Sequence, residues 1–449
     1  MRTLIFGGRV IDPANRVDSF LNLMLEDGKI CWVGTEKPEA DHRIDATGKI
    51  VAPGFIDIHM HEDPVDADGK ILPCIFDSML RMGVTTAVGG NCGINVCDPA
   101  EYLKAVDRHG APVNVAMFAG HEYFRKAAGA TDIYAKATQS QREEMEKNIA
   151  AALEDGCVGV SFGLRYVPGA DEDEFFRAAK CCVKDRKIIA SHVRDDADGI
   201  FGAIEEFAAA GVKYDLPVQI SHIGSMGGFG QMEQVLQMID GYKLRGLDIA
   251  MDCYPYFAFS TRIGTPTYDP GWLERYHCDY GVLEFCEGKY KGQRATQETF
   301  EEMRRDFPEC ITVCYVMKES DVRLAFRHPA VMLGSDGLLN NGQGHPRASG
   351  SFPRFLAEFS REGELSLYDA IYKMTAMPAQ RLHLENKGRL NVGADADITI
   401  FDYQKIRDGA TFADPVLPPT GIDYVIIGGE IAAENCRIVK HDCGRAIRQ

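Results

Sequence analysis

The sequence lacks the features that mark membrane and secreted proteins. No run of about 18 apolar residues occurs in the 449 residues, so a transmembrane helix is not expected. The N-terminal "MRTLIFGGRVIDPANR" has only a short apolar run and no small-residue cleavage site, so a signal peptide is not expected either. None of the 14 cysteines forms a CxxC pair. This pattern is typical of reduced thiols in a cytoplasmic protein.

Positive charge is also scarce. Lysine and arginine number 49 against 66 acidic residues, which gives a formal net charge of −17. Binding to nucleic acid or to an anionic membrane requires a basic surface, so neither partner is expected. The glycine motifs GxGxxG and GxxxxGK[ST] are absent as well, which argues against a nucleotide-binding fold. The expected partner is a small molecule, and the sequence does not indicate an oligomeric state.

The middle of the chain alternates short apolar segments with amphipathic ones. Segments such as "GVTTAVGG", "KIIASHV" and "PVQISHIG" read as buried strands, and "SQREEMEKNIAAALEDG" reads as a helix between two of them. This alternation is typical of βαβ units with a parallel sheet. About eight such units fit, which favours a (β/α)8 TIM barrel over residues 53–387 rather than an open doubly wound sheet. Residues 262–325 interrupt the alternation and are interpreted as an insertion near the substrate mouth.

The two ends of the chain share a different character. Residues 1–52 and 388–449 consist of short apolar runs separated by Gly, Pro and Asp-Gly turns. We expect the two segments to pair into one small β-sandwich domain built from both termini.

Polar residues end several of the predicted strands. In "VAPGFIDIHMHE", an apolar run stops at His59 and His61, whose i, i+2 spacing directs both side chains to one face of a strand. Each such residue alone could be an ordinary polar residue at the end of a strand. In a barrel, however, the carboxyl ends of all strands meet at one mouth, where active sites are built. The polar residues at other strand ends are Cys92, His192, His222 and Asp336.

The residue types in this set indicate a metal. Imidazole and thiolate suit Zn²⁺, and a carboxylate can join them. A catalytic zinc activates water and polarises carbonyl groups. The sequence therefore predicts a zinc-dependent hydrolase that acts on amides, esters or amidines.

Several motifs resemble those of a known superfamily. "GFIDIHMH", the histidines after the fifth and sixth strands and "GSDG" after the last are similar to the amidohydrolase pattern. Within that superfamily, "GVTTAVGGNCG", "GVSFGLRYVPGA", "DCYPYFAFST" and "SDGLLNNGQGHPRASGSFPR" resemble the N-acyl-D-amino-acid deacylases, or D-aminoacylases. The resemblance covers nearly the whole chain. It implies removal of the acyl group from N-acyl amino acids, with a preference for the D configuration.

The resemblance also implies a ligand set. Many amidohydrolases bridge two metals with a carboxylated lysine at the end of the fourth strand, but this chain has Ser161 near that place. The D-aminoacylase pattern uses a cysteine instead. It implies a tightly bound zinc and a second site that is weaker or vacant. The tight zinc would be held by Cys92, His192 and His222, and the weaker site would use His59, His61 and Asp336.

Further roles follow from the same resemblance. Asp336 would be the general base that moves a proton, although an Asp before a turn can also be a helix N-cap. Arg347 of the "HPR" segment would bind the α-carboxylate of the substrate, with a surface salt bridge as the alternative. Tyr254, Ser260 and Tyr166 would form hydrogen bonds with the substrate, although either tyrosine could instead pack in the core.

Two other functions remain open at the level of sequence. A cyclic amidase of dihydroorotase or hydantoinase type shares the fold and the chemistry, but the missing lysine and the "HPR" and "YPY" segments argue against it. A metal-free scaffold of the same fold would be expected to have lost ligands, and this chain keeps them. The stretch between His61 and Cys92 is longer than the deacylase pattern leads us to expect.

Overall fold

The computed structural model describes residues 1–449 as a mixed α/β fold. Its central strands form two parallel sheets, one ordered β10-β9-β8 and the other β11-β12-β13-β14-β15-β19. Every residue of these strands is buried, as is typical of parallel strands covered on both faces. The strands are β8 (Phe55–Asp57), β9 (Val84–Gly89), β10 (Asn114–Met117), β11 (Ala119–Gly120), β12 (Gly159–Gly163), β13 (Ile188–His192), β14 (Val218–Ile220), β15 (Ile249–Cys253) and β19 (Val331–Leu333).

The two parallel sheets are connected at both edges. Only Phe118 separates β10 from β11, and its N–H donates to the carbonyl of Gly89 at 3.0 Å. At the other edge, Met60 beyond β8 forms a parallel bridge with Gly337 beyond β19. The first and last strands of the series therefore lie side by side at their carboxyl ends.

Helices connect the strands and begin at recognisable capping residues. Asp98 caps α2 ahead of Pro99, and Thr138 forms a capping box with Gln141 at the start of α4. Asp171 caps α5. These helices are α1 (Ile75–Arg81), α2 (Pro99–His109), α3 (His121–Ala127), α4 (Gln139–Glu154), α5 (Glu172–Lys180), α6 (Ile200–Tyr214), α7 (Ile223–Gly227), α8 (Met232–Leu244), α11 (Glu319–Arg327), α12 (Arg347–Arg354), α13 (Leu367–Met374) and α14 (Ala376–Arg381). None of the helices has the length and apolar character needed to cross a bilayer.

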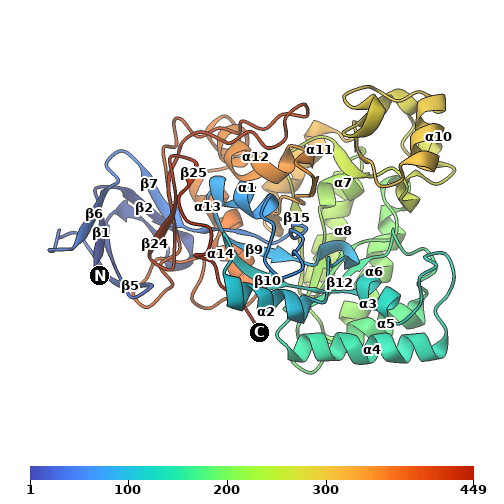
Figure 1. Cartoon of the computed structure of the whole chain (residues 1–449), viewed down its shortest axis with the longest axis horizontal. Coiled ribbons are helices and arrows are strands. Elements are labelled where there is room, and N and C mark those ends of the chain that lie inside the picture. Colours follow the sequence, from blue (N-terminus) through green and yellow to red (C-terminus); the bar gives the residue numbers. More distant parts are fainter.

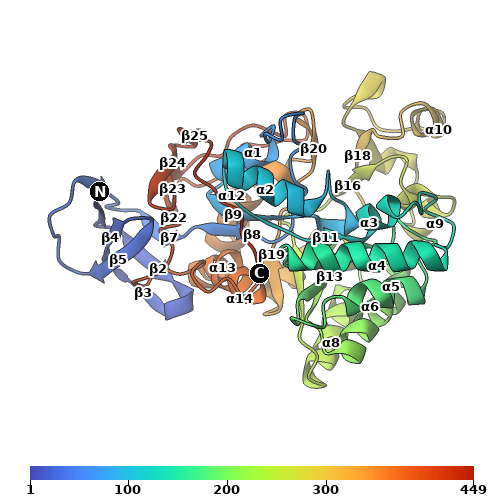
Figure 2. The same ribbon diagram turned by 60° about the horizontal axis from the view of Figure 1, so that its bottom comes forward.

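Strands from both ends of the chain share one sheet. Its order is β25-β24-β23-β22-β7-β2-β3, and β22 pairs antiparallel with β7. A second sheet, β5-β4-β1-β6, lies beside it at one end of the molecule, and Leu23, Val51 and Ile400 pack in a cluster shared by both sheets (Figures 1 and 2). The strands are β1 (Thr3–Phe6), β2 (Arg9–Asp12), β3 (Val17–Phe20), β4 (Asn22–Glu26), β5 (Lys29–Gly34), β6 (His42–Asp45), β7 (Ile50–Pro53), β22 (Ile398–Phe401), β23 (Ile422–Ile427), β24 (Glu430–Glu434) and β25 (Arg437–Ile438).

A small antiparallel sheet interrupts the series between β15 and β19. It consists of β16 (Phe259–Arg262), β18 (Ile311–Cys314) and β17 (Leu283–Phe285). Helices α9 (Trp272–Arg275) and α10 (Gln297–Asp306) accompany it, at the end of the molecule opposite the terminal strands (Figure 1). Helix α11 does not belong to this unit, because it packs against α8, β15 and β19.

Candidate metal centre and active site

The segment after β8, which carries His59 and His61, is hydrogen-bonded to the loop that carries Asp336. The N–H of Asp336 donates to the carbonyl of His59 at 2.7 Å, and the N–H of His61 donates to that of Gly337 at 2.9 Å. Asp336 adopts a left-handed backbone conformation with φ of 50°. Its Oδ1 lies 3.2 Å from His61 Nε2 and 3.5 Å from His59 Nε2. Both imidazoles therefore face one carboxylate.

A tight turn after β9 presents Cys92. Cys92 itself has a positive φ of 54°, and Gly90 before it has a φ of 74°. A Cβ on Gly90 would lie 2.4 Å from the carbonyl oxygen of Phe118, so only glycine fits there. Ser161 holds the turn, because its hydroxyl donates to the carbonyl of Gly90 and accepts from the N–H of Gly93. Ser161 stands near the place where many amidohydrolases have a bridging lysine, and here it holds the turn that carries Cys92.

Four of the predicted ligands form one compact group. Cys92 Sγ lies 3.4 Å from His59 Nε2 and 3.5 Å from His222 Nε2. One ligand atom from each member lies within 4.8 Å of all the others. The group takes two residues from each of the two predicted sites. Its members are His59, Cys92, His222 and Asp336.

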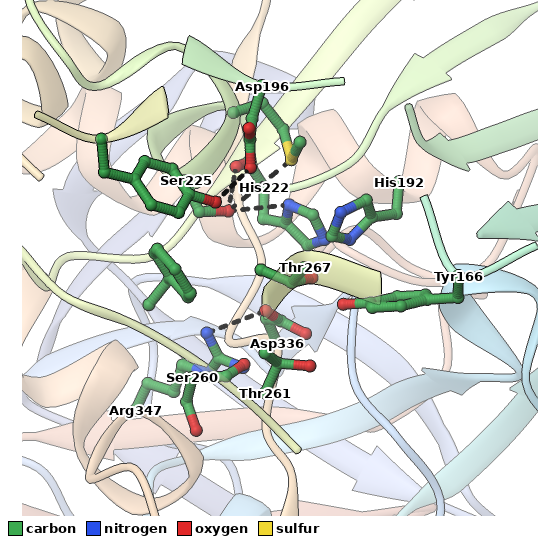
Figure 3. A pocket seen from close by; sticks show the side chains of 13 residues that line it. Tyr166, His192, Asp196, His222, Ser225, Ser260, Thr261, Thr267, Asp336 and Arg347 are labelled. Atoms are coloured by element: carbon green, nitrogen blue, oxygen red, sulfur yellow. Dashed lines mark hydrogen bonds and ion pairs between the residues drawn. The ribbon is translucent and has the colours of Figure 1, made fainter. Parts of the chain in front are cut away.

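His192 borders this group. Its ring centroid lies 4.6 Å from that of His222 (Figure 3), and its Nδ1 is buried without a hydrogen-bond partner. A buried nitrogen without a partner is costly unless something else satisfies it. Thiolate, imidazole and carboxylate donors together suit a divalent cation of the zinc type, and the residues present therefore fit a metal.

The charges in the centre favour the anionic forms of Cys92 and Asp336. Burial opposes ionisation of the Cys92 thiol, but His59 and His222 hold its pKa well below the usual value. Burial likewise opposes ionisation of Asp336, but Arg347 and then His222 hold its pKa well below the usual value. A thiolate and a carboxylate are therefore expected here, as binding of a divalent cation requires.

Asp252, which the sequence reading missed, positions two of the ligands. It is buried in β15, and its Oδ1 lies 3.0 Å from His59 Nδ1 and accepts from the N–H of His222 at 2.8 Å. Gln219 Nε2 donates to the other oxygen at 2.8 Å. An acidic residue inside an apolar strand, followed by "CYPY", is the signal in the sequence that could have identified it.

Asp252→Asn is expected to weaken metal binding by about 10- to 100-fold, the usual effect of losing a carboxylate behind a histidine ligand. Saturating metal should restore most of the activity, because Asp252 lines neither of the two cavities that border Asp336. Chelator competition measures the affinity. Asp185→Asn, which replaces an exposed carboxylate in a turn, is the control. Equal affinities for the two variants would remove Asp252 from this role.

Arg347 lies buried beside the metal centre and not on the surface. It is 2% exposed at the start of α12, and its Nη1 forms an ion pair with Asp336 Oδ2 at 2.9 Å (Figure 3). Nη2 donates to the carbonyl of Ser260 at 3.2 Å. Nε is buried without a partner, and Nη1 has no hydrogen bond of good geometry. Donors of the guanidinium therefore remain for an anion, such as a carboxylate.

Two cavities meet at this point. The inner one has a volume of about 20 Å³ and the outer one about 340 Å³. Most of the free space beside the ligand group therefore lies in the outer cavity. The residues that line both cavities are Tyr166, Ser260, Thr261, Asp336 and Arg347.

Tyr254 is not brought to either cavity. Its ring lies under the guanidinium of Arg347, with the carbon Cζ 4.7 Å from the ring centroid, and its hydroxyl points to Met317 Sδ at 3.8 Å. It is fully buried because β15 leads directly into the core at this position. The structure thus packs Tyr254 against Arg347, which corresponds to the core position that the sequence left open beside a hydrogen bond to the substrate.

Known proteins resemble this chain in sequence. The model of a family described as the amidohydrolase family matches residues 296–433. An N-acyl-D-glutamate deacylase from Alcaligenes xylosoxydans xylosoxydans is 33% identical, with 95% of this chain and 92% of that protein covered. A D-aminoacylase from the same organism is 30% identical, with 99% and 97% covered. The chain belongs to the N-acyl-D-amino-acid deacylase family.

Structures support this membership. The N-acyl-D-glutamate deacylase from Bordetella bronchiseptica, solved with zinc and a phosphonate inhibitor, superposes with a TM-score of 0.89 at 30% identity over 100% of this chain and 99% of that one. This chain accordingly has an α/β fold of the TIM-barrel type. Dihydroorotases are more distant, as one from Geobacter metallireducens is 27% identical over 60% of this chain.

Proposed function

We propose that this chain is a metal-dependent amide hydrolase that removes the acyl group from N-acyl-D-amino acids. The observation that carries the proposal is the placement of Arg347. A buried guanidinium with free donors stands directly beside the ligand group, where the α-carboxylate of an N-acyl amino acid would lie next to its amide bond. The family's relatives, one of them solved with zinc, support this reading.

The proposed metal is Zn²⁺, because the donors include a thiolate and imidazoles. We assign one tight metal site and a second, weaker metal site to this region. His61 and His192 lie beside the compact group and would supply further ligands. Bound there, the cation would polarise the amide carbonyl and lower the pKa of water. The proposed ligands are His59, Cys92, His222 and Asp336, extended by His61 and His192.

Asp336 carries the proton in this proposal. Its carboxylate accepts a proton from the attacking water at Oδ1 and passes it to the nitrogen of the departing amine. The side chain is ready for this role because its pKa is held low by Arg347, after the opposing effect of burial, so it is ionised before the reaction. Arg347 fixes the α-carboxylate, and Tyr166 and Ser260 line the junction where the amide would lie.

The domain organisation remains a proposal as well. We assign residues 53–387 to a closed (β/α)8 barrel, with residues 1–52 and 388–449 forming a β-sandwich. The insertion at 262–325 would shape the substrate mouth, since Thr267 and Tyr276 from it line the inner cavity. All 14 cysteines are unpaired, in keeping with the proposed cytoplasmic location.

Replacing Arg347 tests whether the substrate is an amino-acid derivative. Arg347→Met should lower kcat/KM by roughly 30- to 1,000-fold, the cost of a charge-assisted bidentate contact. Arg347→Lys should restore only part of the loss, because an ammonium cannot reproduce the planar fork. Steady-state kinetics should use an N-acyl-D-amino acid and its α-amide. Wild type should discriminate strongly between them, and Arg347→Met should barely do so.

The same assay separates the cyclic amidase alternative. If wild type treats the free acid and the α-amide alike and hydrolyses a dihydroorotate or hydantoin substrate, the deacylase proposal fails. If both enzymes show the same preference for the free acid, the function stands, and Arg347 does not bind the carboxylate.

A further inference from the structure

A buried glutamate directly follows the second histidine of the predicted ligand set. Glu62 is 4% exposed and is not a member of the compact ligand group. Its carboxylate is hydrogen-bonded to the segment after β9. Oε2 accepts from the N–H of Gly90 at 2.7 Å, and Oε1 accepts from the N–H of Val96 at 3.0 Å. One side chain thus holds both ends of the segment that carries Cys92.

Asn95 extends this contact toward the next strands. Its Nδ2 lies 3.4 Å from Glu62 Oε1 and 3.2 Å from the carbonyl oxygen of Phe118, and its Oδ1 accepts from the N–H of Gly120 at 2.8 Å. The burial of the Glu62 carboxylate is therefore compensated by N–H donors of this one segment. Glu62 borders the outer cavity, but its two oxygens are already engaged there.

The segment that Glu62 holds has an unusual backbone conformation. Gly90, Cys92 and Gly93 all have positive φ, of 74°, 54° and 78°. A cysteine rarely adopts this region, and such a conformation persists only where the surrounding contacts enforce it. The backbone of Gly90 is held on both sides, because its carbonyl accepts from Ser161 and its N–H donates to Glu62. The direction of the Cys92 side chain therefore depends on both contacts.

We propose that Glu62 is a positioning residue that fixes the Cys92 thiolate relative to the His59 imidazole. This inference rests on the proposed metal-dependent function and adds a residue to it. Glu62 lies three residues after His59, so its hydrogen bonds join the segment of the histidines to the segment of the cysteine. Cys92 Sγ lies 3.4 Å from His59 Nε2, and a rotation of the turn would change that separation.

The residue after Glu62 provides a matched control. Asp63 is 1% exposed, and its carboxylate also accepts from backbone N–H groups, at 2.9 to 3.0 Å. Those groups lie at the start of α1, a helix that carries no predicted ligand. Two adjacent buried acids therefore make the same kind of contact. Only Glu62 makes it with the segment of Cys92.

The test measures the Zn²⁺ affinity of Glu62→Gln by chelator competition. The amide keeps the size of the side chain, but its NH₂ group must face an N–H group that the carboxylate now accepts from. The affinity should fall by about 10- to 100-fold relative to wild type, the usual effect of losing a group that orients a ligand. Asp63→Asn should lower Tm, because it also loses an acceptor for buried N–H groups, but should leave the Zn²⁺ affinity unchanged.

A spectrum reports the bond to the cysteine directly. The thiolate is the form that binds a metal, and in a Co²⁺-substituted protein it gives a charge-transfer absorption in the near ultraviolet. Cys92→Ala defines the spectrum without this band. At saturating Co²⁺, Glu62→Gln should show a weakened or shifted band, whereas Asp63→Asn should show the wild-type band. No substrate is needed, so the readout is independent of hydrolysis.

Glu62→Asp separates position from charge. It keeps the carboxylate but shortens the side chain by one methylene, so the two oxygens no longer reach Gly90 and Val96 together. Its Zn²⁺ affinity and its Co²⁺ band should therefore fall as they do in Glu62→Gln. This variant also tests the inference if Glu62→Gln does not fold.

Each other outcome has a definite meaning. Wild-type affinity and a wild-type band in Glu62→Gln overturn the inference, as do equal losses in Glu62→Gln and Asp63→Asn. Wild-type behaviour of Glu62→Asp alone would assign the effect to charge and would also overturn it. Loss of folding in both Glu62 variants would make the residue one of general stability, with the same consequence.

Failure of the proposed function gives a different result. If the wild-type protein binds neither Zn²⁺ nor Co²⁺, the metal-dependent function fails, and the inference fails with it. If the wild-type protein binds Zn²⁺ but hydrolyses no N-acyl amino acid, only the proposed function fails. The affinities and spectra of the Glu62 variants then still decide the role of Glu62.

Discussion

Asp336→Asn is expected to lower kcat by roughly 10² to 10⁴, the usual range for lost acid–base catalysis. The amide keeps the size and shape of the carboxylate but cannot accept a proton from water. The tight metal should remain, because His59, Cys92 and His222 are unchanged. Steady-state kinetics together with metal analysis of the purified variant measure both quantities.

Asp185→Asn serves as the control for this variant too, since its side chain is exposed and lines neither cavity. A rise in KM with an intact kcat would assign Asp336 to substrate binding. Loss of all metal would show that Asp336 acts mainly as a metal ligand. Another residue would then have to transfer the proton.

Cys92→Ala is expected to purify with substoichiometric metal and little activity. The thiolate is the one sulfur ligand in the group, and its Sγ contacts both His59 and His222. Folding should persist, because a small side chain in a loop contributes little to the hydrophobic core. Metal analysis, circular dichroism and turnover on the same preparation distinguish loss of metal from loss of structure.

Cys182→Ala is the matched control, since Cys182 is equally buried, its Sγ donates to the carbonyl of Ile188, and it lies outside the ligand group. Its metal content should equal that of wild type. A Cys92→Ala enzyme with full metal and normal turnover would remove Cys92 from the ligand set.

Much of the site could be predicted from the sequence because strand ends are local features. The spacing of His59 and His61, and the polar residues that stop other apolar runs, follow from periodicity along the chain. Their meeting at one mouth follows from parallel strands. The parallel strands and the sheet shared by both termini could be read from the same patterns, since turn residues and alternation are visible without tertiary contacts.

The grouping of the ligands could not be predicted in the same way. Whether Cys92 lies nearer to His59 or to His192 depends on a left-handed turn held by Ser161, a contact between residues distant in sequence. Asp252 appears in the sequence only as a strand residue, and its contact with His59 joins β15 to the segment that follows β8 in the other parallel sheet. The position of the Tyr254 side chain could not be predicted from the sequence either, because its direction is set by packing under Arg347.

The most direct measurement is a hydrolysis screen with matched D and L forms of N-acetyl-methionine, N-acetyl-glutamine and N-acetyl-glutamate. The enzyme should be assayed after metal removal and again after zinc is restored, with a hydantoin as the cyclic control. The account predicts zinc-dependent release of acetate from D substrates, with the L forms and the hydantoin near background. Hydrolysis of the hydantoin alone, or equal rates with and without metal, would contradict it.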